Sequence, residues 1–251
     1  MTIAEDGEGT HSRESTGIAG LDEVLGGGLP RPSVIALIGA PGCGTTSFCK
    51  RFMISSLRSG RRVILVCGDE PIEHYLRNFG SVESFDIKHY IDEKKLFTLD
   101  LYESFTQSLG IRDYANFQIR EGSLLDAVFP FANKHIRDLA GPPFSGFNVV
   151  LDSITSVAPF IGIREIYRTI LESQRIAREN NHVFLFTGHD GALEGNFVQA
   201  LRTYVDGVIR MRMRWVRTKL RRELIIEKMG LTEIKQPVLE FRIGDEGVEL
   251  K

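Results

Sequence analysis

Short apolar runs rich in β-branched residues recur along the chain and predict strands. They lie at 34–38, 62–67, 96–99, 148–151 and 182–187. Runs of this length, bounded by glycine or polar residues, are typical of strands buried on both faces of a sheet. Between them, apolar side chains at helical spacing predict helices near 45–58, 72–79 and 163–180. This alternation predicts an α/β fold, with a mainly parallel central sheet covered by helices on both faces.

The pattern changes after Gly207. Residues 208–215 alternate apolar side chains with Arg210, Arg212 and Arg214, so these arginines share one face of a strand. Further strands are expected at 223–226 and 238–241, and they would form a C-terminal antiparallel extension of the same sheet. We expect residues 102–122 to form a loop and residues 123–139 to form a helix that Pro130 kinks.

Composition is that of a globular protein with one core. The 251 residues are 42% hydrophobic, which is enough for one sizeable α/β domain and thin for two. We expect this domain to span 15–251. The preceding residues, 1–14, are acidic and polar, lack the basic and apolar regions of a signal peptide, and predict a mobile tail. A net charge of −2 excludes a basic footprint for nucleic acid over the whole molecule.

Cysteine usage and hydropathy indicate the compartment. Cys43, Cys49 and Cys67 form no C-x-x-C pair, and their odd number argues against a disulfide framework. No apolar run approaches the roughly 18 residues that suggest a membrane span. We therefore expect a cytoplasmic protein that does not enter a membrane.

Residues 39–47 have the spacing of a phosphate-binding loop, G-x-x-x-x-G-K-[ST], between a predicted strand and a predicted helix. Glycines let the main chain approach phosphates, and the N–H groups that open the helix favour an anion. The residues expected to bind nucleotide are Gly39, Ala40, Pro41, Gly42, Cys43, Gly44, Thr45, Thr46 and Ser47. Thr46 would also offer its hydroxyl to Mg²⁺. The alternative is a glycine-rich turn without a ligand.

Thr45 replaces the lysine of this motif. Charge-assisted contacts of the kind that lysine makes to phosphates contribute about 1.5–3 kcal/mol, which a threonine cannot supply. Lys50 lies about 140° round the helix from Thr45, so we expect it to point away from the loop. The loop is therefore predicted to bind nucleotide and to support slow hydrolysis or none.

Three acids follow predicted strands. Asp152 ends the run at 148–151, where its carboxylate could hold a water on Mg²⁺ or, alternatively, cap the next helix. Asp69 and Glu70 follow the run at 62–67. Ligands of a parallel sheet bind beyond the carboxyl ends of its strands, so one of this pair could polarise an attacking water. The alternative for the pair is a solvated turn.

Several motifs occur in an order that resembles the KaiC-type domains of the RecA-like ATPase superfamily. They are S-T-G-I-x-G-L-D…G-G-G-L-P at 15–30, L-D-S-I-T-S at 151–156, the strand at 182–187, D-G-V-I at 206–209, E-K-M-G at 227–230 and the segment 241–248. The match covers roughly residues 15–250 and is far more specific than a phosphate-binding loop alone.

The resemblance implies a RecA-like three-layer fold that binds ATP or ADP with Mg²⁺. It also implies a homo-oligomer, often a hexameric ring with nucleotide between subunits. Asp69 and Glu70 match the family's paired acids, and Lys228 matches a lysine that reaches the γ-phosphate of a neighbouring subunit. Gly230 stands where the family often carries an arginine, so a second positive group is absent.

Together these features predict a nucleotide-responsive regulatory or scaffold subunit with weak or absent ATP hydrolysis. One alternative is an active ATPase that uses Lys228 between subunits. Another is a RecA-like protein that binds DNA. The three arginines after Gly207 fit a subunit interface, a solvated strand edge or a nucleic-acid groove, and the mild overall acidity disfavours nucleic acid.

Three further residues have two interpretations each. Trp215, the only tryptophan, stacks a base or packs at a hairpin corner. Cys43 is a redox switch or, as is more common, a small filler. His189 follows the last central strand, where it senses a γ-phosphate or contacts solvent.

Overall fold

The computed structural model describes residues 12–77, 79, 85–102, 146–192, 195–245 and 247–251. Within them, the centre is a nine-stranded sheet with the order β11-β10-β9-β8-β3-β7-β6-β4-β5. Its strands are β3 (Ser33–Gly39), β4 (Arg62–Cys67), β5 (Leu96–Asp100), β6 (Phe147–Asp152), β7 (Val183–His189), β8 (Gly207–Val216), β9 (Lys219–Met229), β10 (Val238–Gly244) and β11 (Gly247–Leu250). Strands β3 to β8 pair in parallel, whereas β9, β10 and β11 continue antiparallel. The predicted mainly parallel sheet with an antiparallel extension is confirmed.

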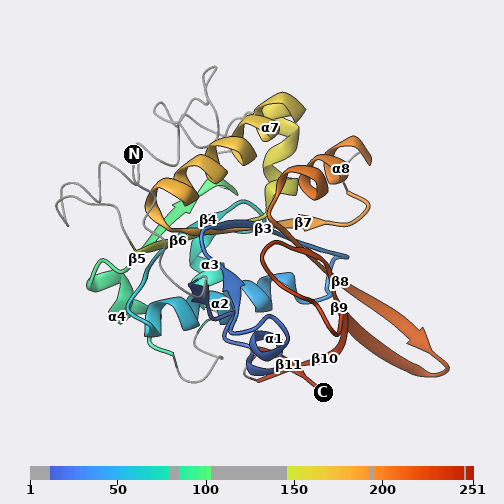
Figure 1. Ribbon diagram of the computed structural model, residues 1–251. Coiled ribbons are helices and arrows are strands. Elements are labelled where there is room, and N and C mark those ends of the chain that lie inside the picture. The colour runs from blue at the N-terminus through green and yellow to red at the C-terminus, as the bar shows by residue number, and fades with distance from the viewer. Residues whose placement is uncertain (1–11, 78, 80–84, 103–145, 193–194, 246) are drawn as a thin grey trace, which may run out of the picture.

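Helices cover both faces of this sheet, as Figure 1 shows. On one face lie α1 (Ala19–Val24), α2 (Thr45–Arg58), α3 (Ile72–Arg77) and α4 (Ile87–Asp92). On the other lie α7 (Ile154–Asn180) and α8 (Gly195–Tyr204). The three-layer arrangement places the carboxyl ends of β3, β4, β6 and β7 at one edge of the sheet.

Successive residues of β3 belong to two separate hydrophobic clusters. Ile35 and Leu37 pack with the α2 side, whereas Ala36 and Ile38 pack with the α7 side. Side chains of a strand alternate between the two faces of a sheet, so a strand buried on both faces must be apolar at every position. This explains the unbroken apolar run of β3 and the runs of its parallel neighbours.

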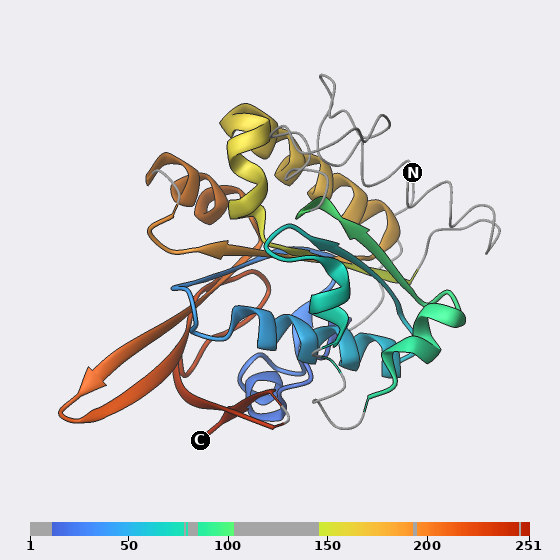
Figure 2. The ribbon, with the colours of Figure 1, turned by 180° about the vertical axis from the view of Figure 1, so that it is seen from behind.

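The hairpin β8–β9 extends beyond the body of the molecule, which Figures 1 and 2 show from opposite sides. Near its tip, Trp215 pairs with Leu220 across the two strands. The tryptophan is 71% exposed and the leucine 39%. The tip therefore presents apolar surface to solvent, so Trp215 does not pack into a hairpin corner.

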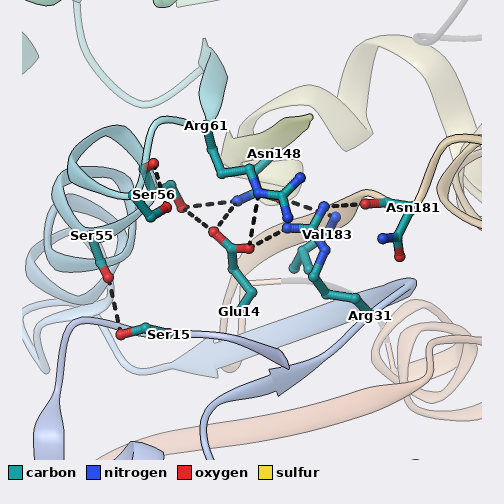
Figure 3. A network of polar contacts seen from close by, with 10 residues as sticks. Glu14, Ser15, Arg31, Ser55, Ser56, Arg61, Asn148, Asn181 and Val183 are labelled. Carbon is teal, nitrogen blue, oxygen red and sulfur yellow. Dashed lines mark hydrogen bonds and ion pairs between the residues drawn. The ribbon is translucent and has the colours of Figure 1, made fainter. Parts of the chain in front are cut away.

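A second, two-stranded sheet joins β1 (Arg13–Glu14) to β2 (Leu29–Pro30). Glu14 is buried, forms an ion pair with Arg31 and accepts a hydrogen bond from Asn148 Nδ2 at 2.7 Å (Figure 3). We expected a mobile tail as far as residue 14, whereas Arg13 and Glu14 are part of the folded structure. A buried carboxylate is stable only with such partners.

Several elements differ from the expected ones. Helix α7 begins at Ile154, well before the predicted start at 163, and α1, α4 and α8 were not predicted. The predicted helix at 123–139 lies outside the described residues, as does the predicted loop at 102–122 except for Tyr102. Among the helices of the described part, none combines the length and the apolarity needed to cross a membrane.

Candidate functional site

The loop between β3 and α2 has the backbone conformation of an anion site. Gly42 and Gly44 have φ values of 79° and 111°, in the left-handed region that favours glycine. Gly44 is also the N-cap residue of α2, and no side chain caps this helix end. The first N–H groups of α2 therefore have no intrahelical acceptor and remain available to an anion.

Side chains of β8 and of the C-terminal antiparallel strands lie close to the same loop. A Cβ atom at Gly44 would lie 2.6 Å from Ile243 Cδ1 of β10. At Gly42, a Cβ atom would be 4.0 Å from Met213 Cε of β8. Side chains of strands distant in sequence thus lie beside the loop, and the positive φ value is what favours glycine at position 44.

Thr45 directs its methyl group back toward β3. The residue is only 6% exposed, and its Cγ2 lies 3.0 Å from the position that a Cβ atom on Gly39 would occupy. Its side chain can supply at most a neutral hydroxyl donor to a phosphate. Ser47 is half-buried in the first turn of α2, after Thr46.

Cys43 is fully buried, and its main-chain N–H donates to the Ala40 carbonyl at 3.0 Å. Burial raises the pKa of the Cys43 thiol, and this outweighs the lowering effect of nearby main-chain donors. A raised pKa disfavours the reactive thiolate, so the structure favours a filler role over a redox switch.

Asp152 lies at the carboxyl end of β6 and is 1% exposed. Its Oδ1 accepts a hydrogen bond from Thr187 Oγ1 at 2.6 Å, and its Oδ2 accepts one from Tyr75 at 3.1 Å. The side chain of Thr46 faces the same carboxylate and lowers its pKa. Burial raises the pKa of Asp152, the nearby charge of Asp69 adds to this, and these three contacts oppose it.

The pairing of Thr46 with Asp152 fits an Mg²⁺ ion. Mg²⁺ keeps several waters and is usually bound through one or two carboxylates together with substrate phosphates. A hydroxyl beside a carboxylate at a phosphate-binding loop supplies the protein side of such a set. The described residues contain no cluster of three or more acidic, histidine or cysteine ligands, so any Mg²⁺ here would need nucleotide oxygens and water.

Asp69 is bound into a network at the carboxyl edge of the sheet. Its Oδ1 accepts hydrogen bonds from Ser153 Oγ at 2.6 Å and from Ser156 Oγ, and its Oδ2 lies 2.7 Å from His189 Nε2. Burial raises the pKa of Asp69, but the hydrogen bonds from His189, Ser153 and Ser156 together lower it below its usual value. A carboxylate with a lowered pKa is a weak general base.

Glu70 differs from its neighbour in its surroundings. It is partly exposed and pairs with His74 Nδ1, one turn along α3. Of the two acids expected to activate water, Glu70 is thus the one that is less constrained. His189, for which the sequence left solvent contact open, lies instead against Asp69, which raises the pKa of this histidine through their hydrogen bond.

We expected Lys50 to point away from the loop. Its side chain instead packs against α3, on the face of α2 that it shares with Thr46. Lys50 is 8% exposed, and its Nζ is 4.8 Å from the centre of the Tyr75 ring and 5.5 Å from that of Phe79. Tyr75 in turn donates to Asp152. The expectation measured the angle from Thr45, whereas residues four apart on a helix share a face.

Lys228 is held by the end of α8. Its Nζ donates to the carbonyl oxygen of Val205 at 2.6 Å and to that of Thr203 at 3.3 Å. Cations are favoured near the carboxyl end of a helix, so this position stabilises α8 within the same chain.

The arginines of β8 are paired with acids of the same chain. Arg212 Nη2 lies 2.8 Å from Glu223 Oε2, and Arg214 pairs with the other oxygen of Glu223. Arg210 Nη1 lies 2.6 Å from Asp190 Oδ2. These ion pairs offset much of the positive charge that a nucleic-acid groove would need.

Comparison with known proteins gives one consistent family. The family model for the KaiC ATPase matches residues 14–251. A UPF0273 protein of Pyrococcus horikoshii is 28% identical over 242 residues, covering 94% of this chain and 92% of that protein. One from Thermotoga maritima is 27% identical over 241 residues, with 94% of each covered. The crystal structure of a KaiC-like protein from Pyrococcus horikoshii shares the fold, with a TM-score of 0.75 at 21% identity, covering 96% and 99% of the two chains.

Proposed function

The chain belongs to the KaiC family of ATPases and has its RecA-like fold, and we propose that it binds ATP or ADP with Mg²⁺ and hydrolyses ATP slowly or not at all. In this proposal it acts in the cytoplasm as a regulatory or scaffold subunit whose assembly responds to nucleotide. Family membership supports nucleotide binding. The slow hydrolysis and the regulatory role rest on the residues of this chain.

The observation that carries the binding proposal is the uncapped start of α2 beneath two glycines of positive φ. Main-chain N–H groups at such a turn form a concave anion site that needs no ammonium group. Thr46 and Asp152 lie beside it and suit an Mg²⁺ ion that nucleotide oxygens help to hold. Mg²⁺, when bound, would neutralise charge between the β- and γ-phosphates.

Slow turnover follows from the charges around the terminal phosphate. Thr45 supplies no positive charge, which by itself weakens binding by about ten- to a hundredfold. Phosphoryl transfer depends mostly on electrostatic positioning, so the rate suffers more than the affinity. Asp69 is already occupied by three hydrogen-bond partners, which leaves Glu70 as the proposed residue that orients the attacking water.

The alternative in which Lys228 activates a neighbour has a structural cost. Lys228 would have to give up two carbonyl partners at the end of α8 before it could reach across a subunit interface. A homo-oligomer, possible as a hexameric ring in this family, remains part of the proposal because nucleotide at a subunit interface would couple binding to assembly. DNA binding is less favoured, because the arginines of β8 are paired with acids.

Calorimetric titration with MgATP and MgADP tests binding. We expect saturable binding of both by the wild-type chain, and weaker MgATP binding by Asp152→Asn because the variant loses the charge that helps to hold Mg²⁺. Phosphate release, measured at several protein concentrations, tests turnover. No uptake of either nucleotide at high excess would refute the proposal. Rapid hydrolysis that rises with protein concentration and is lost in Lys228→Met would instead favour the alternative.

A further inference from the structure

A buried ammonium group lies behind the candidate Mg²⁺ site. Lys50 is 8% exposed, although lysine is rarely buried without an anionic partner. Within the described part of the chain, its ammonium group lies over the faces of Tyr75 and Phe79, and no carboxylate lies within ion-pair distance. Cation–π contacts offset only part of the cost of removing an ammonium group from water. The packing of α2 alone therefore does not explain a lysine at this position.

The geometry of α2 directs this side chain toward the loop. Side chains of a helix tilt toward its N-terminus, and residues four apart lie on one face. Lys50 therefore extends back toward Thr46, with its Nζ over the ring of Tyr75. Tyr75 donates to Asp152, so three elements bring the ammonium group, the tyrosine and the carboxylate together.

We propose that Lys50 supplies, from within the same chain, positive charge to the γ-phosphate end of the nucleotide site, which supports ATP binding without restoring the direct phosphate contact that the chain lacks at Thr45. This inference rests on the proposed nucleotide binding and identifies a residue that contributes to the affinity. Charges act strongly across a site from which water is excluded. An ammonium group behind Thr46 and Asp152 therefore favours the more anionic of two nucleotides, ATP over ADP.

The electrostatic surroundings agree with this role. Burial lowers the pKa of Lys50, while the negative charges of Glu70 and Asp152 raise it and so oppose that effect. A bound triphosphate would add negative charge on the same side and favour the ammonium form further. The contact of Lys50 Nζ with the Tyr75 ring, and the hydrogen bond from Tyr75 to Asp152, put the ammonium group on the Asp152 side of α2, where the Mg²⁺ ion is proposed to bind.

The test is nucleotide affinity in Lys50→Met, which keeps most of the length of the side chain and removes its charge. We expect the dissociation constant for MgATP to rise about tenfold and that for MgADP to change less, since one charge-assisted interaction with the γ-phosphate is lost. Arg58→Met is the matched control, because Arg58 is an exposed cation in the last turn of the same helix. It should bind both nucleotides as the wild type does.

Thermal unfolding without nucleotide separates this role from a structural one. Burying an ammonium group is unfavourable, so Lys50→Met should unfold at the same temperature as the wild type or higher. The double variant Thr45→Lys/Lys50→Met provides a rescue. It should bind MgATP more tightly than Lys50→Met alone, and nearly as tightly as Thr45→Lys alone.

Equal MgATP affinity of wild type and Lys50→Met would overturn the inference while leaving the proposed function intact. Equal loss of MgATP and MgADP binding together with a lower unfolding temperature would also overturn it, in favour of a packing role. If the wild type binds neither nucleotide, the proposed function and this inference both fail.

Discussion

Lys50 and Asp152 are two buried ionisable residues on which burial acts in opposite directions. Burial lowers the pKa of the lysine and raises that of the aspartate, because in both cases it disfavours the charged form. The negative charges of Glu70 and Asp152 oppose this effect for Lys50, and contacts with Thr187, Thr46 and Tyr75 oppose it for Asp152. Such support is typical of functional sites, where charges are kept although a neutral core would be more stable.

His182 predicts a loss of stability in acid. The histidine is 3% exposed, and burial, followed by the charges of Arg31 and Arg61, lowers its pKa to about 4. In the unfolded chain it titrates near 6.5. Between these values the unfolded state binds more protons, so the free energy of unfolding falls as the pH drops from about 6.5 to about 4, by roughly 3 kcal/mol.

Urea denaturation at pH 7 and pH 4 checks this prediction. His182→Leu should lose less stability between the two pH values than the wild type, because its side chain cannot bind a proton. His89→Gln, at an exposed histidine of α4, should behave as the wild type. An identical loss in wild type and His182→Leu would contradict the prediction.

At the scale of single residues, the sequence indicates which residues lie at the carboxyl ends of strands but not their partners. The strand predictions placed Asp69 and Asp152 at one edge, because parallel strands share that edge. The hydrogen bond between Asp69 and His189 joins residues 120 positions apart, and no local pattern encodes it. The direction of Lys50 could have been predicted by measuring from Thr46, since the helix itself was correctly placed.

One buried carboxylate joins strand β1 to two other elements and to Arg31, which lies between β2 and β3. Glu14 pairs with Arg31, and its Oε1 accepts hydrogen bonds from Asn148 of β6 and from Ser56 of α2 (Figure 3). The network lies at the amino end of β6, where β6 pairs with the start of β7. It therefore fixes the opposite edge of the sheet from the candidate nucleotide site.

Glu14→Ala should destabilise the protein by about 3–5 kcal/mol, because it leaves the guanidinium group of Arg31 buried without its counter-ion. Chemical denaturation measures this change. Glu93→Ala is the control, since Glu93 is exposed and pairs only at the surface, where an ion pair contributes little. A loss below about 1 kcal/mol in Glu14→Ala would show that the network does not stabilise the fold in this way.

At the scale of elements, apolar runs and helical spacing were sufficient for the central strands and for α2. These patterns failed where a folded element consists of charged residues. Glu14 and Arg13 are charged, so the sequence suggested a tail, yet β1 is held by partners from distant segments. Helix α7 starts directly after β6, and the early start was missed because the apolar periodicity was recognised only from 163 onward.

For the whole molecule, we expect nucleotide to promote assembly. Sedimentation or light scattering should give a higher mass with MgATP than without nucleotide, since a ring with nucleotide between subunits gains stability from binding. Trp215 offers a second signal, because it is the only tryptophan and is 71% exposed. If the β8–β9 hairpin enters the interface, its emission should shift to shorter wavelength on assembly.

An unchanged mass at saturating MgATP would argue against assembly as the response to nucleotide. A change in mass without a change in Trp215 emission would retain assembly and exclude the hairpin tip from the interface. Arg58→Met, whose substitution lies away from the hairpin in sequence and in fold, serves as the control for general effects of charge on mass.

The contact between Ile243 and Gly44 has a practical consequence for anyone who modifies the carboxy terminus. Strand β10 touches the loop that is proposed to hold phosphate, and β11 pairs with β10 and packs beside α2. An affinity tag or reporter fused after Lys251 would therefore disturb the strands that lie beside the proposed ligand site. Purification handles are better attached ahead of residue 12, and a clipped carboxy end should be ruled out by mass spectrometry before weak ligand uptake is attributed to the protein itself.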